Sequence, residues 1–286
     1  MGAAALSAGL GLLVGLAALL AGDGPSPAAL SAHADTLRAR LDPAEFHVVI
    51  AAPFVVVGDG PAAEVERHAE RTVRWAVRRL REAFFERGPA EVIEIWLFGD
   101  AASYQRNTRL RFGHRPHTPF GFYSPEHRAL VMDISTGGGT LVHEIVHPFV
   151  RADFPTCPAW LNEGLGSLFE QCGEDGEGRI VGRTNWRLED LQRAIRAGQL
   201  PPFAALLATS QEAFYGQDPG TNYAQARYLC YYLQEQGLLR RFYREFRAGY
   251  AVDPTGLETL KRVLGTDDLG RFQREWSEFV LGLRFP

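Results

Sequence analysis

Two histidines and a glutamate in the middle of the chain have a spacing that suits metal chemistry. The run LVHEIVHPFV places His143 and His147 at positions i and i+4, with Glu144 directly after the first histidine. Positions i and i+4 share one face of a helix, so both imidazoles can reach one divalent cation. The neighbouring carboxylate can then take a proton from a water bound to that cation. The flanking residues are apolar, which predicts a buried helix whose ionisable groups need a compensating partner such as a cation.

A catalytic zinc ion usually has three protein ligands, so the histidine pair predicts a third. Glu163, in the run AWLNEG, lies in the first turn of a second predicted helix that follows a turn at residues 153–156. This helix can run back past the first one, so Glu163 is the expected third ligand. Glu170, two turns further on, is the alternative ligand. A glutamate that favours the dipole at a helix N-terminus is the competing explanation for Glu163.

The motif HEIVH followed by WLNEG resembles the gluzincin metallopeptidases, in particular the peptidase-MA-like bacterial proteins and, more distantly, the catalytic domain of M1 aminopeptidases. The resemblance extends from Phe46 to the C-terminus. It implies that His143, His147 and Glu163 bind Zn²⁺ and that Glu144 is the general base for a metal-activated water. It also implies that Tyr223, at the start of a later helix, donates a hydrogen bond to the oxyanion.

The sequence departs from that family pattern at two places. Pro148 directly follows the second histidine and lacks the amide that would bond back along the helix, which predicts a bend there. The Gly-x-Met-Glu-Asn stretch, with which M1 aminopeptidases bind the free amino end of a substrate, is absent. The second departure favours an endopeptidase over an aminopeptidase.

The hydrophobic pattern predicts an α+β fold of the zincin-like type. An N-terminal α/β lobe, residues 45–134, is expected to hold a mixed sheet with strands at 46–50, 54–57, 91–98, 121–123 and 129–132 and helices at 62–87 and 101–111. A helical zinc-binding lobe, residues 135–286, is expected to hold helices at 141–150, 160–171, 188–197, 223–236, 238–248, 254–264 and 269–281. The active-site cleft is predicted between the two lobes.

The N-terminal 22 residues are apolar and almost free of charge, which is typical of a signal peptide or of an N-terminal membrane anchor. Both alternatives place the folded part outside the cytoplasm, as a secreted, periplasmic or membrane-anchored protein. Residues 23–44 follow as an expected linker.

Composition excludes several other classes of protein. The net charge of −4, with arginines scattered among glutamates, argues against a nucleic-acid partner. The three cysteines form no CxxC pair, which argues against a cysteine zinc site. Three buried thiols are expected, and one disulfide with one free thiol is the alternative for an exported protein. The sequence therefore predicts an exported zinc metallopeptidase that acts on a peptide or protein substrate. The alternative is a zincin-like binding module of the cell envelope that has no catalytic activity.

Overall fold

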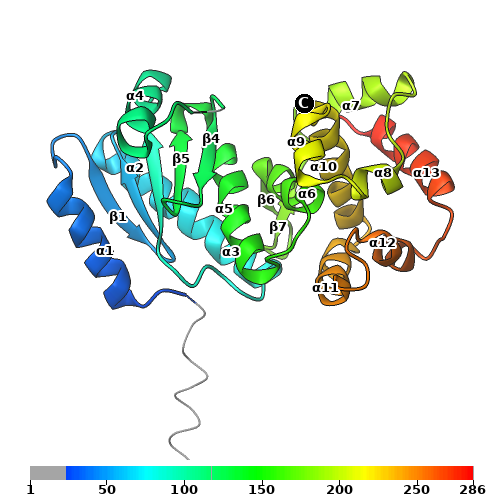
Figure 1. Cartoon of the computed structure of the whole chain (residues 1–286), viewed down its shortest axis with the longest axis horizontal. Coiled ribbons are helices and arrows are strands. Elements are labelled where there is room, and N and C mark those ends of the chain that lie inside the picture. The colour runs from blue at the N-terminus through cyan, green and yellow to red at the C-terminus, as the bar shows by residue number, and fades with distance from the viewer. Residues whose placement is uncertain (1–23, 117, 286) are drawn as a thin grey trace, which may run out of the picture.

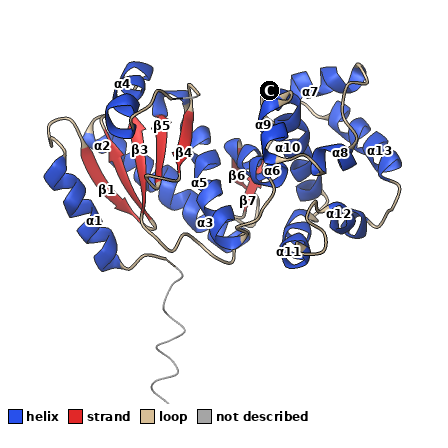
Figure 2. Cartoon of the chain, viewed as in Figure 1, coloured by secondary structure: helices blue, strands red, loops and turns tan. Residues whose placement is uncertain are grey.

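The computed structural model describes residues 24–116 and 118–285 and has an α+β architecture. A five-stranded mixed sheet with covering helices occupies the N-terminal half, and helices dominate the C-terminal half (Figures 1 and 2). The predicted signal peptide or anchor at residues 1–22 lies outside the described residues. Within the described part of the chain, no helix combines the length and the apolar character needed to cross a bilayer.

The sheet contains the strands expected from the runs of β-branched and aromatic residues. Its strands are β1 (His47–Ala51), β2 (Phe54–Gly58), β3 (Ile93–Phe98), β4 (Gly121–Ser124) and β5 (Ala129–Asp133). Their order is β1-β2-β3-β5-β4, with a parallel centre and an antiparallel strand at each edge. Strand β4 is therefore an edge strand that pairs with β5 alone.

Helices cover both faces of the sheet because side chains alternate along each strand. Val55 and Val57 pack with α1 (Pro27–Arg40) and α4 (Ala101–Phe112) on one face. Phe54 and Val56 face the main core on the other side. That side is covered by the α5 helix (Gly138–Asp153) and by one long helical stretch made of α2 (Ala62–His68), the π-helical segment η1 (Ala69–Arg74) and α3 (Trp75–Ala83). The short 3-10 turn η2 (Ile134–Thr136) precedes α5.

The prediction of a linker at residues 23–44 is wrong, because helix α1 occupies most of this segment. Leu30, Ala34 and Leu37 recur at helical spacing and are buried against the sheet. The Ser26 side chain caps the helix by accepting a hydrogen bond from the Ala29 amide. Pro27 takes the first position of the helix, where no amide donor is needed, so a proline here begins a helix and does not mark a linker.

The C-terminal half contains every helix that the sequence predicted there. In chain order they are α5, described above, and α6 (Ala159–Glu170), α7 (Arg187–Arg196), α10 (Pro219–Glu235), α11 (Leu239–Gly249), α12 (Leu257–Leu264) and α13 (Leu269–Gly282). The elements that the sequence analysis missed are short, namely the hairpin of β6 (Cys172–Glu174) and β7 (Ile180–Gly182) and the helices α8 (Phe203–Leu207) and α9 (Gln211–Gly216). In Figure 1, α5 and α6 lie between the sheet and the remaining C-terminal helices.

Candidate metal centre

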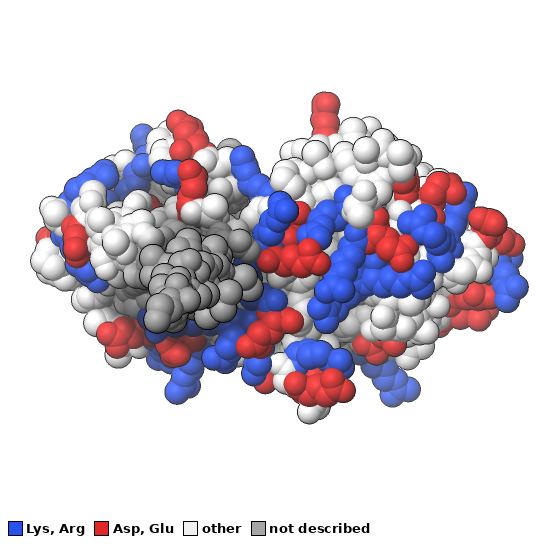
Figure 3. Space-filling model, turned by 90° about the horizontal axis from the view of Figure 1, so that it is seen from below, with Lys and Arg blue, Asp and Glu red and all other residues white. Residues whose placement is uncertain are grey.

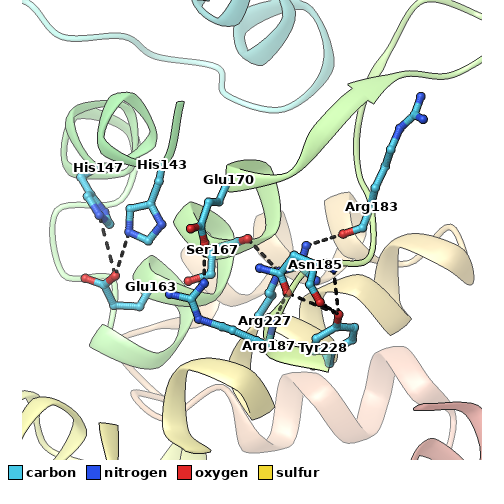
Figure 4. Close-up of polar contacts among 10 residues, drawn as sticks. All are labelled: His143, His147, Glu163, Ser167, Glu170, Arg183, Asn185, Arg187, Arg227 and Tyr228. Carbon is cyan, nitrogen blue, oxygen red and sulfur yellow. Dashed lines mark hydrogen bonds and ion pairs between the residues drawn. The ribbon is translucent and has the colours of Figure 1, made fainter. Parts of the chain in front are cut away.

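The three residues predicted as metal ligands come together between α5 and α6. Glu163 Oε2 lies 3.3 Å from His143 Nε2 and 3.8 Å from His147 Nε2. One possible ligand atom from each residue lies within 4.8 Å of the others, and both imidazoles point toward the carboxylate (Figure 4). Two imidazole nitrogens and one carboxylate oxygen form a donor set that suits a zinc ion with an open fourth position. The group can therefore hold a metal ion.

Helices α5 and α6 approach closely because glycines remove side chains from their interface. A Cβ atom at Gly166 would lie 3.0 Å from His143 Nε2 and 3.1 Å from His147 Cε1. One turn before the histidines, a Cβ at Gly139 would collide with the backbone oxygen of Glu170. Glycine at these two positions lets α6 present Glu163 directly to the histidine face of α5.

Helix α5, which carries both histidines, continues past its proline. Pro148 is buried inside α5, which extends to Asp153 before it ends. A helix tolerates the loss of one backbone hydrogen bond where packing on several sides holds it, and the residues around Pro148 are buried. Both histidines precede the proline and keep the i, i+4 geometry that the sequence predicted.

The orientation of His147 is fixed by Asn162, which the sequence analysis did not single out. His147 Nδ1 lies 3.0 Å from Asn162 Oδ1. When this nitrogen donates its proton to the amide oxygen, Nε2 keeps a free lone pair toward Glu163. A hydrogen bond to the far nitrogen of a ligating histidine sets its tautomer in this way. Because Asn162 directly precedes Glu163, α6 supplies both a ligand and the support for another ligand.

Glu163 is buried, with 5% of its surface exposed, and its pKa is nevertheless lowered to about 2. Burial raises this pKa, but the electrostatic interaction with His147 and the hydrogen bond and electrostatic interaction with His143 lower it by more. The Tyr215 hydroxyl donates a hydrogen bond of 2.6 Å to Glu163 Oε1. The carboxylate is therefore ionised and held from both sides, as a metal ligand must be.

Sequence reasoning missed Tyr215, which lies on the short helix α9. The helix has six residues, and no periodic pattern in the sequence marks it. Two aromatic contacts connect this region to α10, since Phe214 packs at 5.3 Å and Tyr215 at 6.3 Å from the ring of Tyr223. The only local signal was Ser210, which caps α9 through the Ala213 amide.

Glu144 is partly buried, and its side chain has no recorded hydrogen bond or ion pair among the described residues. Burial raises its pKa to about 7, and the negative charges of Glu163 and Glu170 add to this rise while His147 opposes it. A carboxylate whose pKa lies near neutral is suited to accept and release a proton. The group is thus a free proton acceptor beside the metal ligands.

Tyr223 lies near the centre but is not one of its ligands. Burial raises the pKa of its phenol, and the negative charge of Glu163 raises it further, so the phenol stays protonated. Its ring lies 5.7 Å from the guanidinium carbon of Arg187. A protonated phenol can donate a hydrogen bond, so the predicted oxyanion role of Tyr223 fits this chemistry and remains a prediction.

Glu170, the alternative ligand, binds an arginine instead of the metal group. Its Oε2 lies 2.5 Å from Arg187 Nη1, and Glu170 is absent from the candidate ligand set (Figure 4). Beside this pair, the buried Arg227 donates from Nε to the Ser167 carbonyl at 2.8 Å. Beyond Glu163, helix α6 thus binds two arginines, Arg187 through the Glu170 carboxylate and Arg227 through the Ser167 carbonyl. The three cysteines are free thiols, as expected.

The sequence matches no protein-family model, and no curated protein is significantly similar to it. The geometry of the site is therefore the basis for the function proposed below.

Proposed function

We propose that the protein is a zinc-dependent metallopeptidase of the gluzincin type with a zincin-like fold. The observation that carries the proposal is the convergence of His143, His147 and Glu163, with the unpaired carboxyl of Glu144 beside them. A purely structural zinc site is closed by four ligands and needs no base. Here three ligands and a base of near-neutral pKa occur together, which favours catalysis over the alternative of a binding module without activity.

Each side chain around the site has its own role in the proposed reaction. A bound zinc ion supplies the Lewis acid that lowers the pKa of a water molecule and polarises a carbonyl group. Glu144 takes the proton of the attacking water and then passes it to the leaving amine. Tyr223 donates a hydrogen bond to the oxyanion that develops on the substrate carbonyl. Tyr215 and Asn162 hold Glu163 and His147 in the orientation that the ligands need.

Strand β4 supports a peptide as the substrate. It forms one edge of the sheet, pairs with β5 alone and lies next to α5. An extended peptide can add to such an edge through main-chain hydrogen bonds. Because this mode of binding needs no free chain end, it favours an endopeptidase. We further propose that residues 1–22 export or anchor the protein, which places its substrates outside the cytoplasm.

The test is turnover of a broad peptide library by the purified protein. We expect hydrolysis that a chelator removes and that added Zn²⁺ restores. Glu144→Gln should lower kcat by about a hundred- to ten-thousandfold, because it removes the base. It should leave the zinc content at the wild-type level. The matched control is Glu278→Gln on α13, where the exposed glutamate has no recorded partner.

Two results would contradict the proposal. Undiminished hydrolysis by Glu144→Gln would exclude the mechanism. Peptide binding without any cleavage by the zinc-loaded wild type would favour the binding module.

A further inference from the structure

A cavity of about 360 Å³ lies between the N-terminal ends of α7 and α10. Its walls include Trp186, Arg187, Leu191, Pro219, Tyr223 and Ala224. Tyr223 connects the cavity to the candidate ligands, because it lines the cavity and its ring lies 6.3 Å from that of Tyr215, whose hydroxyl donates a hydrogen bond to Glu163. The volume lies at the low end of the range for ligand pockets, which suits one large side chain better than a whole cofactor.

The charged groups around this cavity already have partners. Arg187 is bound to Glu170 at 2.5 Å, and both side chains are mostly buried. At the rim, Asp190 pairs with Arg193 at 2.9 Å, and the Asp218 carboxylate accepts a hydrogen bond from the Thr221 amide at 3.3 Å. Arg187, the one basic side chain among the described residues of the wall, is therefore neutralised by Glu170, so the cavity offers no free cation that would select an acidic side chain.

What the cavity does offer is aromatic and aliphatic surface. Trp186 is 55% exposed, which is unusual for so large an apolar side chain, and the Arg187 guanidinium stacks on its ring at 4.1 Å. This stack limits the motion of the indole. Leu191 and Ala224 are buried and contribute apolar surface to the wall. Aromatic pairs gain about 0.5–1.5 kcal/mol beyond the burial of their area, so an aromatic ligand benefits most from such walls.

We propose that this cavity, which we call the Trp186 pocket, binds a large aromatic side chain of the peptide substrate next to the scissile bond. The inference rests on the proposed peptidase function and names its substrate class. Trp186 is the specificity-determining residue, and Tyr223 joins the pocket to the reacting carbonyl. The enzyme therefore prefers peptides with phenylalanine, tyrosine or tryptophan at this one position.

The kinetic test compares peptides that differ at one position, with phenylalanine or alanine there. The wild type should favour the phenylalanine peptide in kcat/KM by about tenfold or more. Trp186→Ala should bring this ratio close to one, and Trp186→Phe should restore part of it. Gly220→Leu should also lower the ratio by filling the pocket, since the nearest atom to a Cβ there is 4.0 Å away. Leu110→Ala, which truncates an exposed residue on α4, is the matched control and should keep the wild-type ratio.

A binding measurement separates this inference from the proposed function. Zinc-loaded Glu144→Gln protein is titrated with capped phenylalanine amide and with capped alanine amide, with and without Trp186→Ala. Tighter binding of the aromatic amide that Trp186→Ala removes supports the pocket even if no peptide is hydrolysed. Hydrolysis without any aromatic preference overturns the pocket and leaves the peptidase proposal intact. Equal binding of the two amides, together with no peptide hydrolysis by the wild type, contradicts both the Trp186 pocket and the peptidase proposal.

Discussion

Glu163 uses its two carboxylate oxygens for different purposes. Oε2 faces the two histidines, and Oε1 accepts the hydrogen bond from Tyr215 at 2.6 Å. The tyrosine therefore fixes the rotation of the carboxylate and decides which oxygen is presented to a metal ion. Partners of this kind typically contribute ten- to a hundredfold to metal affinity.

Tyr215→Phe should accordingly weaken zinc binding by about ten- to a hundredfold without unfolding the protein. The measurement is a competition titration against a chromogenic zinc chelator. Tyr250→Phe is the matched control, because the Tyr250 ring packs on Phe154 and Phe246 and its hydroxyl has no recorded partner. Equal affinity of Tyr215→Phe and the wild type would show that Tyr215 does not position Glu163.

The sequence predicted the candidate ligands but not the residues that support them. His143 and His147 could be found because their spacing is local and a helix turns it into proximity. Glu163 could be found because its helix follows after a short turn. Tyr215 could not, since it reaches Glu163 only through the tertiary packing of α9 against α6 and α10. Asn162 could have been found, because it precedes a predicted ligand by one residue.

At the scale of elements, the contact between α5 and α6 controls the site. Gly166 lies one turn beyond Glu163, against the imidazoles of both histidines. Gly166→Ala should push at least one imidazole ring out of position and reduce zinc affinity by at least about tenfold. Its effect on thermal stability should be smaller than its effect on zinc affinity. Gly282→Ala is the matched control, because a Cβ at the end of α13 meets no atom within 4 Å. Unchanged zinc affinity in Gly166→Ala would contradict the claim that the close contact between α5 and α6 controls the site.

Most long elements were predictable from the sequence, whereas the short ones and helix α1 were not. The strands of the sheet follow from runs of β-branched and other apolar residues, and the helices of the C-terminal half follow from apolar residues at helical spacing. The 14-residue helix α1 was missed because its buried stripe is sparse, with only Leu30, Ala34 and Leu37 among alanines and polar residues. The β6–β7 hairpin has three residues in each strand, too few for a recognisable alternation.

At the scale of the whole molecule, a buried acid connects the two halves of the chain. Asp153, at the end of α5, has a fully buried side chain that binds Arg247 and Tyr243 of α11 at 2.5 and 3.0 Å. It also accepts a hydrogen bond from the Arg87 amide at 2.9 Å, in the segment that leads to β3. The Asp153 carboxylate thus connects helix α5 with the segment before β3 and with helix α11.

Asp153→Asn should lower the free energy of unfolding by about 1–3 kcal/mol, because it weakens the charge-assisted hydrogen bonds at a buried site, while Arg247 keeps its ion pair with Glu86. Chemical denaturation of the full chain measures this loss. The matched control is Asp35→Asn, which breaks an exposed pair with Arg38 and should cost less than about 1 kcal/mol. A loss of equal size in the two variants would contradict a structural role for the Asp153 cluster.

Figure 3 shows how the charged side chains are distributed over one face of the molecule. Basic and acidic side chains are interspersed there, and several basic side chains lie side by side in the right half of the view. Composition alone predicted this mixture, since arginines and glutamates alternate along the helices.

The metal content of the purified chain tests the central claim most directly. After dialysis against Zn²⁺ and removal of excess metal, the wild type and the Glu278→Gln control should retain one zinc ion per chain. Glu163→Gln should lose most of it at the same free zinc concentration, because the variant lacks the third, charged ligand. A wild type that retains no zinc, or a Glu163→Gln variant that holds zinc as tightly as the wild type, would contradict the account.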